Sequence, residues 1–241
     1  MVLEVENLTK LYKNGRGAED ISFALAPGEV LGLLGPNGSG KTTIMKAIVG
    51  LVQSTRGSVR ICGVPLSDGY EAALSHVGAL IEAPALYEHM TAFANLRLAA
   101  RFYDNVDDTR IAEVLELVEM DRYRKDKISS FSLGMRQRTG LALALLSEPD
   151  LLILDEPANG LDIEGMILVR DIVTEAAQRG AAVLISSHLA HQIEVCASGV
   201  AIMHSGRLLC LETMENVLQA SPSLEDFFLA QVAKTKVVDN L

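Results

Sequence analysis

The residues with the clearest chemical meaning lie between positions 35 and 43, where the sequence reads Gly-Pro-Asn-Gly-Ser-Gly-Lys-Thr-Thr. This stretch fits the pattern G-x-x-x-x-G-K-[ST], in which backbone N–H groups surround a chain of phosphates. Lys41 is placed to reach the β and γ phosphates, and the Thr42 hydroxyl to bind Mg²⁺. The stretch therefore predicts a nucleotide site lined by Asn37, Gly38, Ser39, Gly40, Lys41, Thr42 and Thr43.

Two adjacent acids, Asp155 and Glu156, end the apolar run 151–154. Neighbouring residues of a strand point to opposite faces, so the two carboxylates should have different tasks. One would hold Mg²⁺ while the other aligned an attacking water. The alternative is a strand that simply ends in solvated acids. The phosphate-binding pattern earlier in the chain favours the catalytic interpretation.

Three further residues have both a functional and an ordinary structural interpretation. Tyr12 could stack on a purine ring or be a surface aromatic residue. Ser132 could bind an anion or only cap the helix that follows it. His188 ends a second apolar strand, and a histidine there could contact phosphate or be structural.

The elements that must position these residues follow from apolar spacing. Segments 2–9 and 21–25 alternate as half-exposed strands, and segment 57–63 is expected to join them in a small antiparallel sheet. Continuous apolar runs, such as the one before Asp155, are typical of parallel strands covered on both faces. From residue 86 to about 127, apolar residues recur every three or four positions, which predicts a helical subdomain.

Composition limits the alternatives. The chain has 241 residues, 49% of them hydrophobic, which is enough for a substantial core. Its net charge of −10 disfavours broad nucleic-acid binding, and its apolar runs are far shorter than the ~20 residues of a membrane span. We expect no secretion signal, and three reduced, partly buried cysteines, namely Cys62, Cys196 and Cys210.

Taken together in their order along the chain, these motifs resemble those of the ATP-binding subunit of ABC transporters. The resemblance covers about residues 2–230. The resemblance implies that Tyr12 stacks on adenine and that segment 35–43 is the Walker A loop. It also makes Asp155 the Walker B aspartate and Glu156 the catalytic glutamate. Asp162 then belongs to the D-loop, and His188 is the switch histidine near the γ-phosphate.

Two motifs depart from the family pattern. The signature, usually Leu-Ser-Gly-Gly-Gln, here reads Phe-Ser-Leu-Gly-Met at 131–135 and keeps Ser132 and Gly134. The Q-loop glutamine is replaced by Glu82, to which the resemblance gives a catalytic and metal-binding position. Both departures resemble the branch of transporters that protects bacteria against lantibiotics and bacitracin.

The resemblance implies a P-loop NTPase core with a mainly parallel sheet, an N-terminal antiparallel subdomain and an inserted helical subdomain. We expect the core and antiparallel subdomain in 1–85 and 150–220, the helical part in 86–149, and a C-terminal helix and tail in 221–241, with the tail frayed from Lys234. ATP and Mg²⁺ are the expected ligands, with Lys41, Glu82, Glu156 and His188 catalytic.

The expected partners are a second nucleotide-binding subunit, identical or different, and separate polytopic membrane subunits. Ser132 and Gly134 would then complete the partner subunit's ATP site. This places the chain in the cytoplasm, on the inner face of the plasma membrane. Two alternatives are a soluble ABC ATPase acting on ribosomes or DNA, and a regulatory module that senses nucleotide without turnover.

Overall fold

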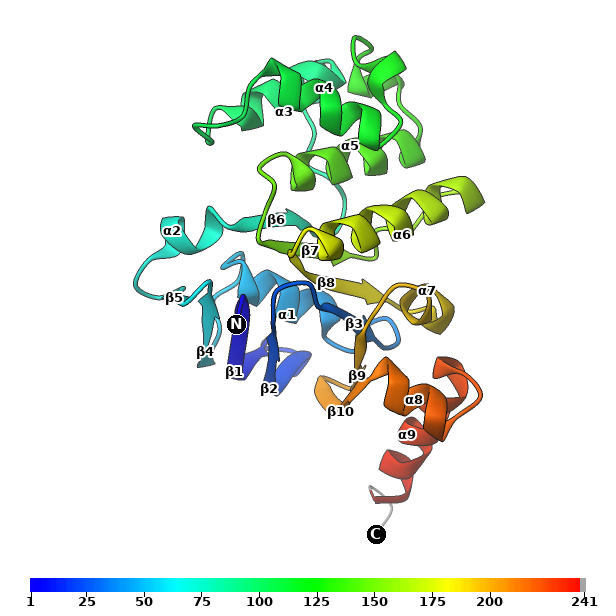
Figure 1. Ribbon diagram of the computed structural model, residues 1–241. Helices are drawn as coiled ribbons and strands as arrows, with labels where there is room; N and C mark the ends of the chain where they lie inside the picture. Colours follow the sequence, from blue (N-terminus) through cyan, green and yellow to red (C-terminus); the bar gives the residue numbers. More distant parts are fainter. Residues whose placement is uncertain (239–241) are drawn as a thin grey trace.

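The fold is that of a computed structural model, which describes residues 1–238. Its main sheet has six strands in the order β10-β9-β3-β8-β7-β6, all parallel except β10. The strands are β3 (Val30–Leu34), β6 (Val77–Leu80), β7 (Leu151–Asp155), β8 (Ala182–Ser187), β9 (Gly199–His204) and β10 (Arg207–Thr213). Figure 1 shows this sheet at the centre of the molecule.

A second, antiparallel sheet packs together with helix α1 (Lys41–Ile48) on one face of the main sheet (Figure 1). Its order is β2-β1-β4-β5, formed by β1 (Leu3–Leu11), β2 (Gly17–Leu25), β4 (Arg56–Ile61) and β5 (Val64–Pro65). The expected third strand of this sheet is thus confirmed, because β4 pairs with β1.

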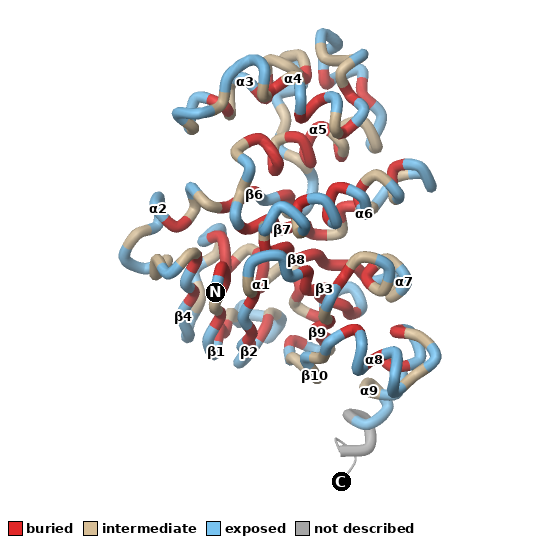
Figure 2. Tube along the Cα trace, in the orientation of Figure 1, coloured by how far each residue is buried: buried red, intermediate tan, exposed pale blue. Residues whose placement is uncertain are grey.

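Side-chain alternation along the central strands produces two separate hydrophobic clusters. In β7, Leu151 and Ile153 belong to the cluster shared with the antiparallel sheet and helix α1 (Lys41–Ile48). Leu152 and Leu154 belong to the cluster on the other face, with the remaining helices. Burial on both faces explains why the strand is a continuous apolar run, and Figure 2 shows its buried trace.

Helices cover the second face and build the helical subdomain seen at the top of Figure 1. The subdomain contains α3 (Ala92–Ala100), α4 (Asp108–Leu117), short 3₁₀ turns at Asp121–Tyr123 and Ile128–Ser130, and α5 (Leu133–Leu145). The other helices are α2 (Tyr70–Leu74), α6 (Ile163–Gln178), α7 (Ala190–Glu194), α8 (Met214–Ala220) and α9 (Leu224–Val238). The predicted α/β fold class is confirmed.

The C-terminal end differs from expectation. Helix α9 continues to Val238, so residues 234–238, predicted as the start of a frayed tail, are helical. Its apolar residues Leu224 and Phe227 are buried in the core, which anchors the helix at its start. The last three residues of the predicted tail, 239–241, lie outside the described part of the chain.

Candidate nucleotide site

The predicted phosphate loop connects β3 to α1 at the carboxyl edge of the main sheet. Gly40 precedes the helix with φ of 105°, a left-handed conformation that favours glycine. A Cβ atom on Gly35 would lie 2.2 Å from the Met203 carbonyl oxygen, so no larger residue fits there. These restraints fold the loop over the helix N-terminus, where backbone N–H groups and the helix dipole favour an anion.

Lys41 lies in the first helical turn and is only 5% exposed. Its ammonium group donates a hydrogen bond to the Gly35 carbonyl at 2.7 Å and lies 3.4 Å from Glu156 Oε1. Among the side chains that the structure describes, those of residues 1–234, two buried atoms lack a hydrogen-bond partner, and both lie here: Ser39 Oγ and Glu156 Oε1. A buried hydroxyl without a partner suits a phosphate oxygen, and a carboxylate oxygen that accepts no hydrogen bond can accept one from a water molecule.

Asp155 connects the loop to the strand ends. Its Oδ2 accepts a hydrogen bond from the Thr42 hydroxyl at 2.8 Å, and its Oδ1 accepts one from the Ser186 hydroxyl at 2.6 Å. The paired oxygens of Thr42 and Asp155 are the kind of hard ligand that Mg²⁺ prefers. The structure thus brings together two of the three predicted metal ligands, and the side chains of these two fit the ion.

Ser186 was not singled out from the sequence. It is fully buried on β8, in register with Asp155 of β7, and its oxygen also accepts a hydrogen bond from the Glu156 N–H at 2.9 Å. One hydroxyl therefore holds both acids. The available signal was that Ser186 directly follows the apolar run 182–185 and lies two residues before the predicted histidine.

Glu156 and His188 lie in direct contact. His188 Nδ1 is 2.8 Å from Glu156 Oε2, which fixes one carboxylate oxygen and leaves the other near Lys41. The Glu156 backbone has φ of 48°, an unusual left-handed conformation for a residue other than glycine. The hydrogen bond from the Glu156 N–H to Ser186 holds this conformation. The side chain of Glu156, just after the end of β7, therefore lies beside Lys41 and His188. The predicted roles of the pair in catalysis stay predictions.

Glu82 forms an ion pair, and its predicted catalytic and metal-binding position stays a prediction. Its Oε1 lies 2.7 Å from Lys46 Nζ on α1, and its side chain is 60% exposed. Lys46 follows Thr42 by one helical turn, so the ion pair lies directly along α1 from the predicted metal ligand. The extra negative charge in the Q-loop is thus compensated by a neighbouring lysine.

The signature residues lie at the start of α5 and face the segment after β7. Ser132 is the N-cap of α5, and its hydroxyl accepts a hydrogen bond from the Met135 N–H at 3.2 Å. A Cβ atom at Gly134 would lie 3.4 Å from the Leu161 side chain. Capping, the structural alternative for Ser132, is therefore observed, and its predicted contact with ATP of another subunit stays a prediction.

The segment that follows the two acids is held to the helical subdomain. Asp162 caps α6 by accepting a hydrogen bond from the Gly165 N–H at 2.9 Å. Buried Gln137 of α5 donates to the Pro157 carbonyl at 3.2 Å. Gln137 was not identified from the sequence, because a buried glutamine in a helix has no distinct pattern. The contact couples the signature helix to the strand end that carries Glu156.

Tyr12 lies in the turn between β1 and β2 and is 41% exposed. The Lys10 ammonium group is 5.4 Å from the centre of its ring. An exposed aromatic ring on a hairpin turn is available for stacking on a base. Its contact with adenine stays a prediction.

Comparisons with known proteins agree with this geometry. A family model described as ABC transporter matches residues 18–159. The chain is 42% identical over 216 residues to YhcH, an uncharacterized ABC transporter ATP-binding protein of Bacillus subtilis, covering 89% of this chain and 71% of YhcH. Over 209 residues it is 38% identical to the bacitracin transport ATP-binding protein BcrA of Enterococcus faecalis, covering 86% of this chain and 68% of BcrA.

The lantibiotic transport ATP-binding protein SrtF of Streptococcus pyogenes is 34% identical, with 96% of this chain and 97% of SrtF covered. A solved structure of the ATP-binding subunit of an ABC transporter superposes with a TM-score of 0.89 at 31% identity, covering 96% of this chain and 100% of that one. The chain therefore belongs to the ABC transporter family and is an ATP-binding, ATP-hydrolysing subunit of it.

Proposed function

We propose that this chain hydrolyses MgATP to power the export of a cell-envelope peptide antibiotic through separate membrane subunits. The observation that carries the ATPase part is the network of Thr42, Asp155, Ser186, Glu156 and His188 around the phosphate loop. The substrate class is supported by similarity to BcrA and SrtF, whose names specify bacitracin and lantibiotic transport.

In this proposal the triphosphate lies in the loop, with Lys41 exchanging its Gly35 contact for phosphate oxygens. Thr42 and Asp155 would hold a magnesium ion, which would neutralise charge on the phosphates. Glu156 aligns the attacking water with the γ-phosphate and accepts its proton, while His188 fixes the glutamate carboxylate. As the water oxygen bonds to the γ-phosphorus, the bond from that phosphorus to the bridging oxygen breaks and ADP is the leaving group. Such hydrolysis depends mainly on positioning and charge stabilisation, which the hydrogen-bonded network can supply.

We further propose that two ATP-binding subunits close head to tail, so that Ser132 and Gly134 contact the γ-phosphate held by the other subunit. Leu133, between these two residues, is 64% exposed, and Ile163, the first residue of α6, is 71% exposed. Apolar groups beside a polar signature suit burial against a second copy. Loss of the γ-phosphate would then open the interface.

The membrane partner is proposed to dock near residues 82–96, between the core and the helical subdomain. Asn95 is 4% exposed and holds the Tyr87 backbone at both its N–H and its carbonyl, at 2.8 and 3.2 Å. The Tyr87 side chain is 54% exposed on this fixed loop. Within residues 1–238, no helix is long and apolar enough to cross a bilayer.

Antibiotic susceptibility tests the substrate proposal. The chain would be expressed with its candidate membrane subunits in a sensitive host, next to matched strains carrying Glu156→Gln or lacking the membrane subunits. We expect bacitracin or a lantibiotic to be tolerated only with both components intact. Equal sensitivity of all strains, with ATPase activity confirmed in the purified protein, would reject the peptide class and leave the ATPase assignment standing.

A further inference from the structure

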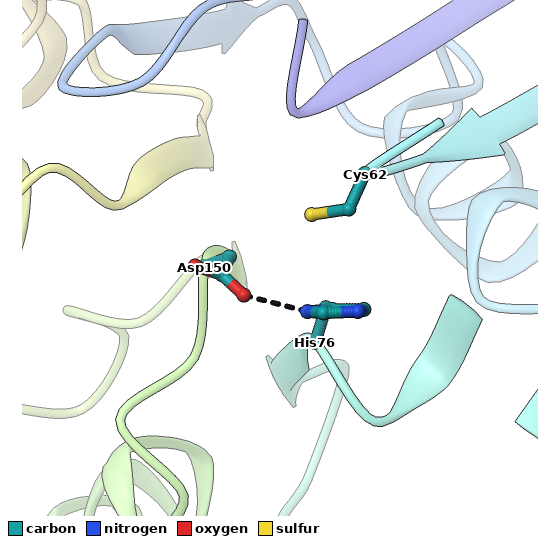
Figure 3. A group of neighbouring side chains, drawn as sticks. All are labelled: Cys62, His76 and Asp150. Atoms are coloured by element: carbon teal, nitrogen blue, oxygen red, sulfur yellow. Dashed lines mark hydrogen bonds and ion pairs between the residues drawn. The ribbon is translucent and has the colours of Figure 1, made fainter. Parts of the chain in front are cut away.

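A second cluster of chemically active side chains lies away from the nucleotide site. It contains Cys62, His76 and Asp150, and one ligand atom from each lies within 4.8 Å of the other two. His76 Nδ1 and Asp150 Oδ2 are 2.6 Å apart. Figure 3 shows the Cys62 sulfur turned toward the gap beside this pair. A thiol, an imidazole and a carboxylate that converge in this way form a donor set suited to a transition metal.

Regular structure places each of the three residues. His76 directly precedes β6 and Asp150 directly precedes β7, and these strands are parallel neighbours with Val77 paired to Leu151. The backbone is fixed too, because the Leu151 N–H donates to the His76 carbonyl at 3.0 Å. Both side chains therefore lie at the amino edge of the sheet. Asp155 is five residues along β7, about 16 Å away at the usual rise of a strand.

Cys62 arrives from the other sheet. It follows β4 in a two-residue hairpin turn with Gly63, and both residues have positive φ, 49° and 78°. Such turns favour asparagine, aspartate or glycine at the first position, so cysteine is an unusual residue there. The Cys62 N–H donates to the Val2 carbonyl at 2.8 Å, which ties the turn to the N-terminal strand. The cluster thus bridges the antiparallel sheet and the main sheet.

We propose that Cys62, His76 and Asp150 form a zinc-type metal site that fastens the antiparallel sheet to the amino edge of the main sheet. The expected coordination is tetrahedral, with water as the fourth ligand, since His76 and Asp150 are 39% and 60% exposed. Tetrahedral bonds of about 2.1 Å separate ligand atoms by about 3.4 Å. The His76–Asp150 pair must therefore open slightly, which partly exposed side chains permit.

Binding would replace the Cys62 S–H bond by a sulfur–metal bond and release one proton to solvent. The site is independent of the proposed transport function, because none of its three residues belongs to the nucleotide network. A bound metal ion would cross-link residues 62, 76 and 150 of the chain. The metal is therefore expected to stabilise the fold without entering ATP hydrolysis.

Cobalt spectroscopy of the full chain tests the proposal, with chelator-treated protein free of nucleotide and Mg²⁺. We expect Co²⁺ to give a thiolate-to-metal absorption band that one equivalent of Zn²⁺ removes by displacement. Cys62→Ser should abolish the band, whereas Cys210→Ser, a change at another half-buried free thiol, should leave it intact. His76→Gln and Asp150→Asn should each weaken Co²⁺ binding at least about tenfold.

Thermal unfolding gives a second, independent readout. Zn²⁺ should raise the melting temperature of the wild type and of Cys210→Ser, and should leave that of Cys62→Ser unchanged. Circular dichroism establishes that each variant is folded. The proposal is overturned if the wild type shows no thiolate band, if Cys62→Ser keeps it, or if His76→Gln and Asp150→Asn bind Co²⁺ as tightly as the wild type.

Discussion

At the residue scale, the central feature is that one buried hydroxyl positions two acids. Ser186 donates to Asp155 and accepts from the Glu156 N–H, and these contacts connect the proposed metal ligand to the proposed base. Both partners of these bonds lie at strand ends, where the backbone of Glu156 adopts its left-handed conformation. We therefore regard Ser186 as a positioning residue for ATP hydrolysis.

Ser186→Ala should lower kcat for ATP about tenfold or more, because the rate depends on precise positioning and both acids lose a hydrogen bond that fixes them. The KM for ATP should change less, since Lys41 and the loop remain. Thr174→Ala is a suitable control, because that hydroxyl bonds only the Arg170 carbonyl on an exposed helix surface. Equal loss of kcat in both variants, or an unchanged kcat in Ser186→Ala, would contradict the positioning role.

Glu82→Gln tests the departure in the Q-loop. Its ion pair with Lys46 is largely exposed, so the free energy of unfolding should change by less than about 1 kcal/mol. A change in ATPase rate or antibiotic tolerance would then reflect the coupling of ATP hydrolysis to transport, not a loss of fold stability. We expect Glu82→Gln to change the ATPase rate and the antibiotic tolerance by different factors. Lys46→Met, which removes the other partner of the ion pair, should change each quantity in the same direction as Glu82→Gln does. Identical tolerance and rate in all three proteins would make the acid incidental.

Cysteine reactivity follows from burial at Cys196. Burial raises the pKa of this thiol to about 11. At pH 8 only about one molecule in a thousand carries the reactive thiolate, and that fraction grows as pH rises toward the pKa. Alkylation at pH 8, followed by mass spectrometry, should therefore label Cys196 very slowly. Rapid labelling in the folded protein would contradict the burial seen in the structure.

At the scale of elements, glycine allows the signature helix to approach the sheet. A Cβ atom on Gly78 of β6 would lie 1.8 Å from the Ala144 carbonyl oxygen in α5. Backbone cannot retreat as a flexible side chain can, so α5 packs this closely only on a glycine. The position of Ser132 and Gln137 on α5 depends on that contact.

Gly78→Ala should therefore lower the free energy of unfolding by about 2 kcal/mol or more, as overpacking of a core does. Gly134→Ala, at the exposed start of the same helix, has its nearest contact at 3.4 Å and should be near neutral. Urea denaturation of both variants decides the matter. Equal stability of the two would show that α5 can shift without cost.

The sequence predicted those features whose pattern lies within one short segment, and it missed those that depend on contacts between distant segments. The strand that ends at Asp155 was predicted correctly, because its apolar run lies within one short segment, and segment 35–43 forms a loop where its motif predicted one. Ser186 and Gln137 were missed, since their roles come from contacts between segments far apart in the chain. The helical state of 234–238 was missed for the same reason: α9 is anchored by tertiary burial of Leu224. The boundaries at 85/86 and 149/150 stay predictions.

At the scale of the whole molecule, the account requires a second subunit. Leu133 is exposed at the signature and should become buried when two ATP-bound subunits close. Leu133→Asp should leave the monomer folded but prevent ATP-dependent dimerisation in size-exclusion chromatography with light scattering. Leu229→Asp, a 57% exposed leucine on α9 at the opposite end of the molecule in Figure 1, should not affect dimerisation. A dimer in both variants would place the interface elsewhere.

The central claim is that Glu156 is needed for ATP hydrolysis but not for ATP binding. The most direct measurement compares Glu156→Gln with the wild type in steady-state phosphate release and in equilibrium binding of ATP. We predict a fall in turnover of at least about a hundredfold, with ATP affinity within a few-fold of the wild type. Turnover close to that of the wild type, with ATP binding intact, would remove Glu156 from catalysis and contradict the account.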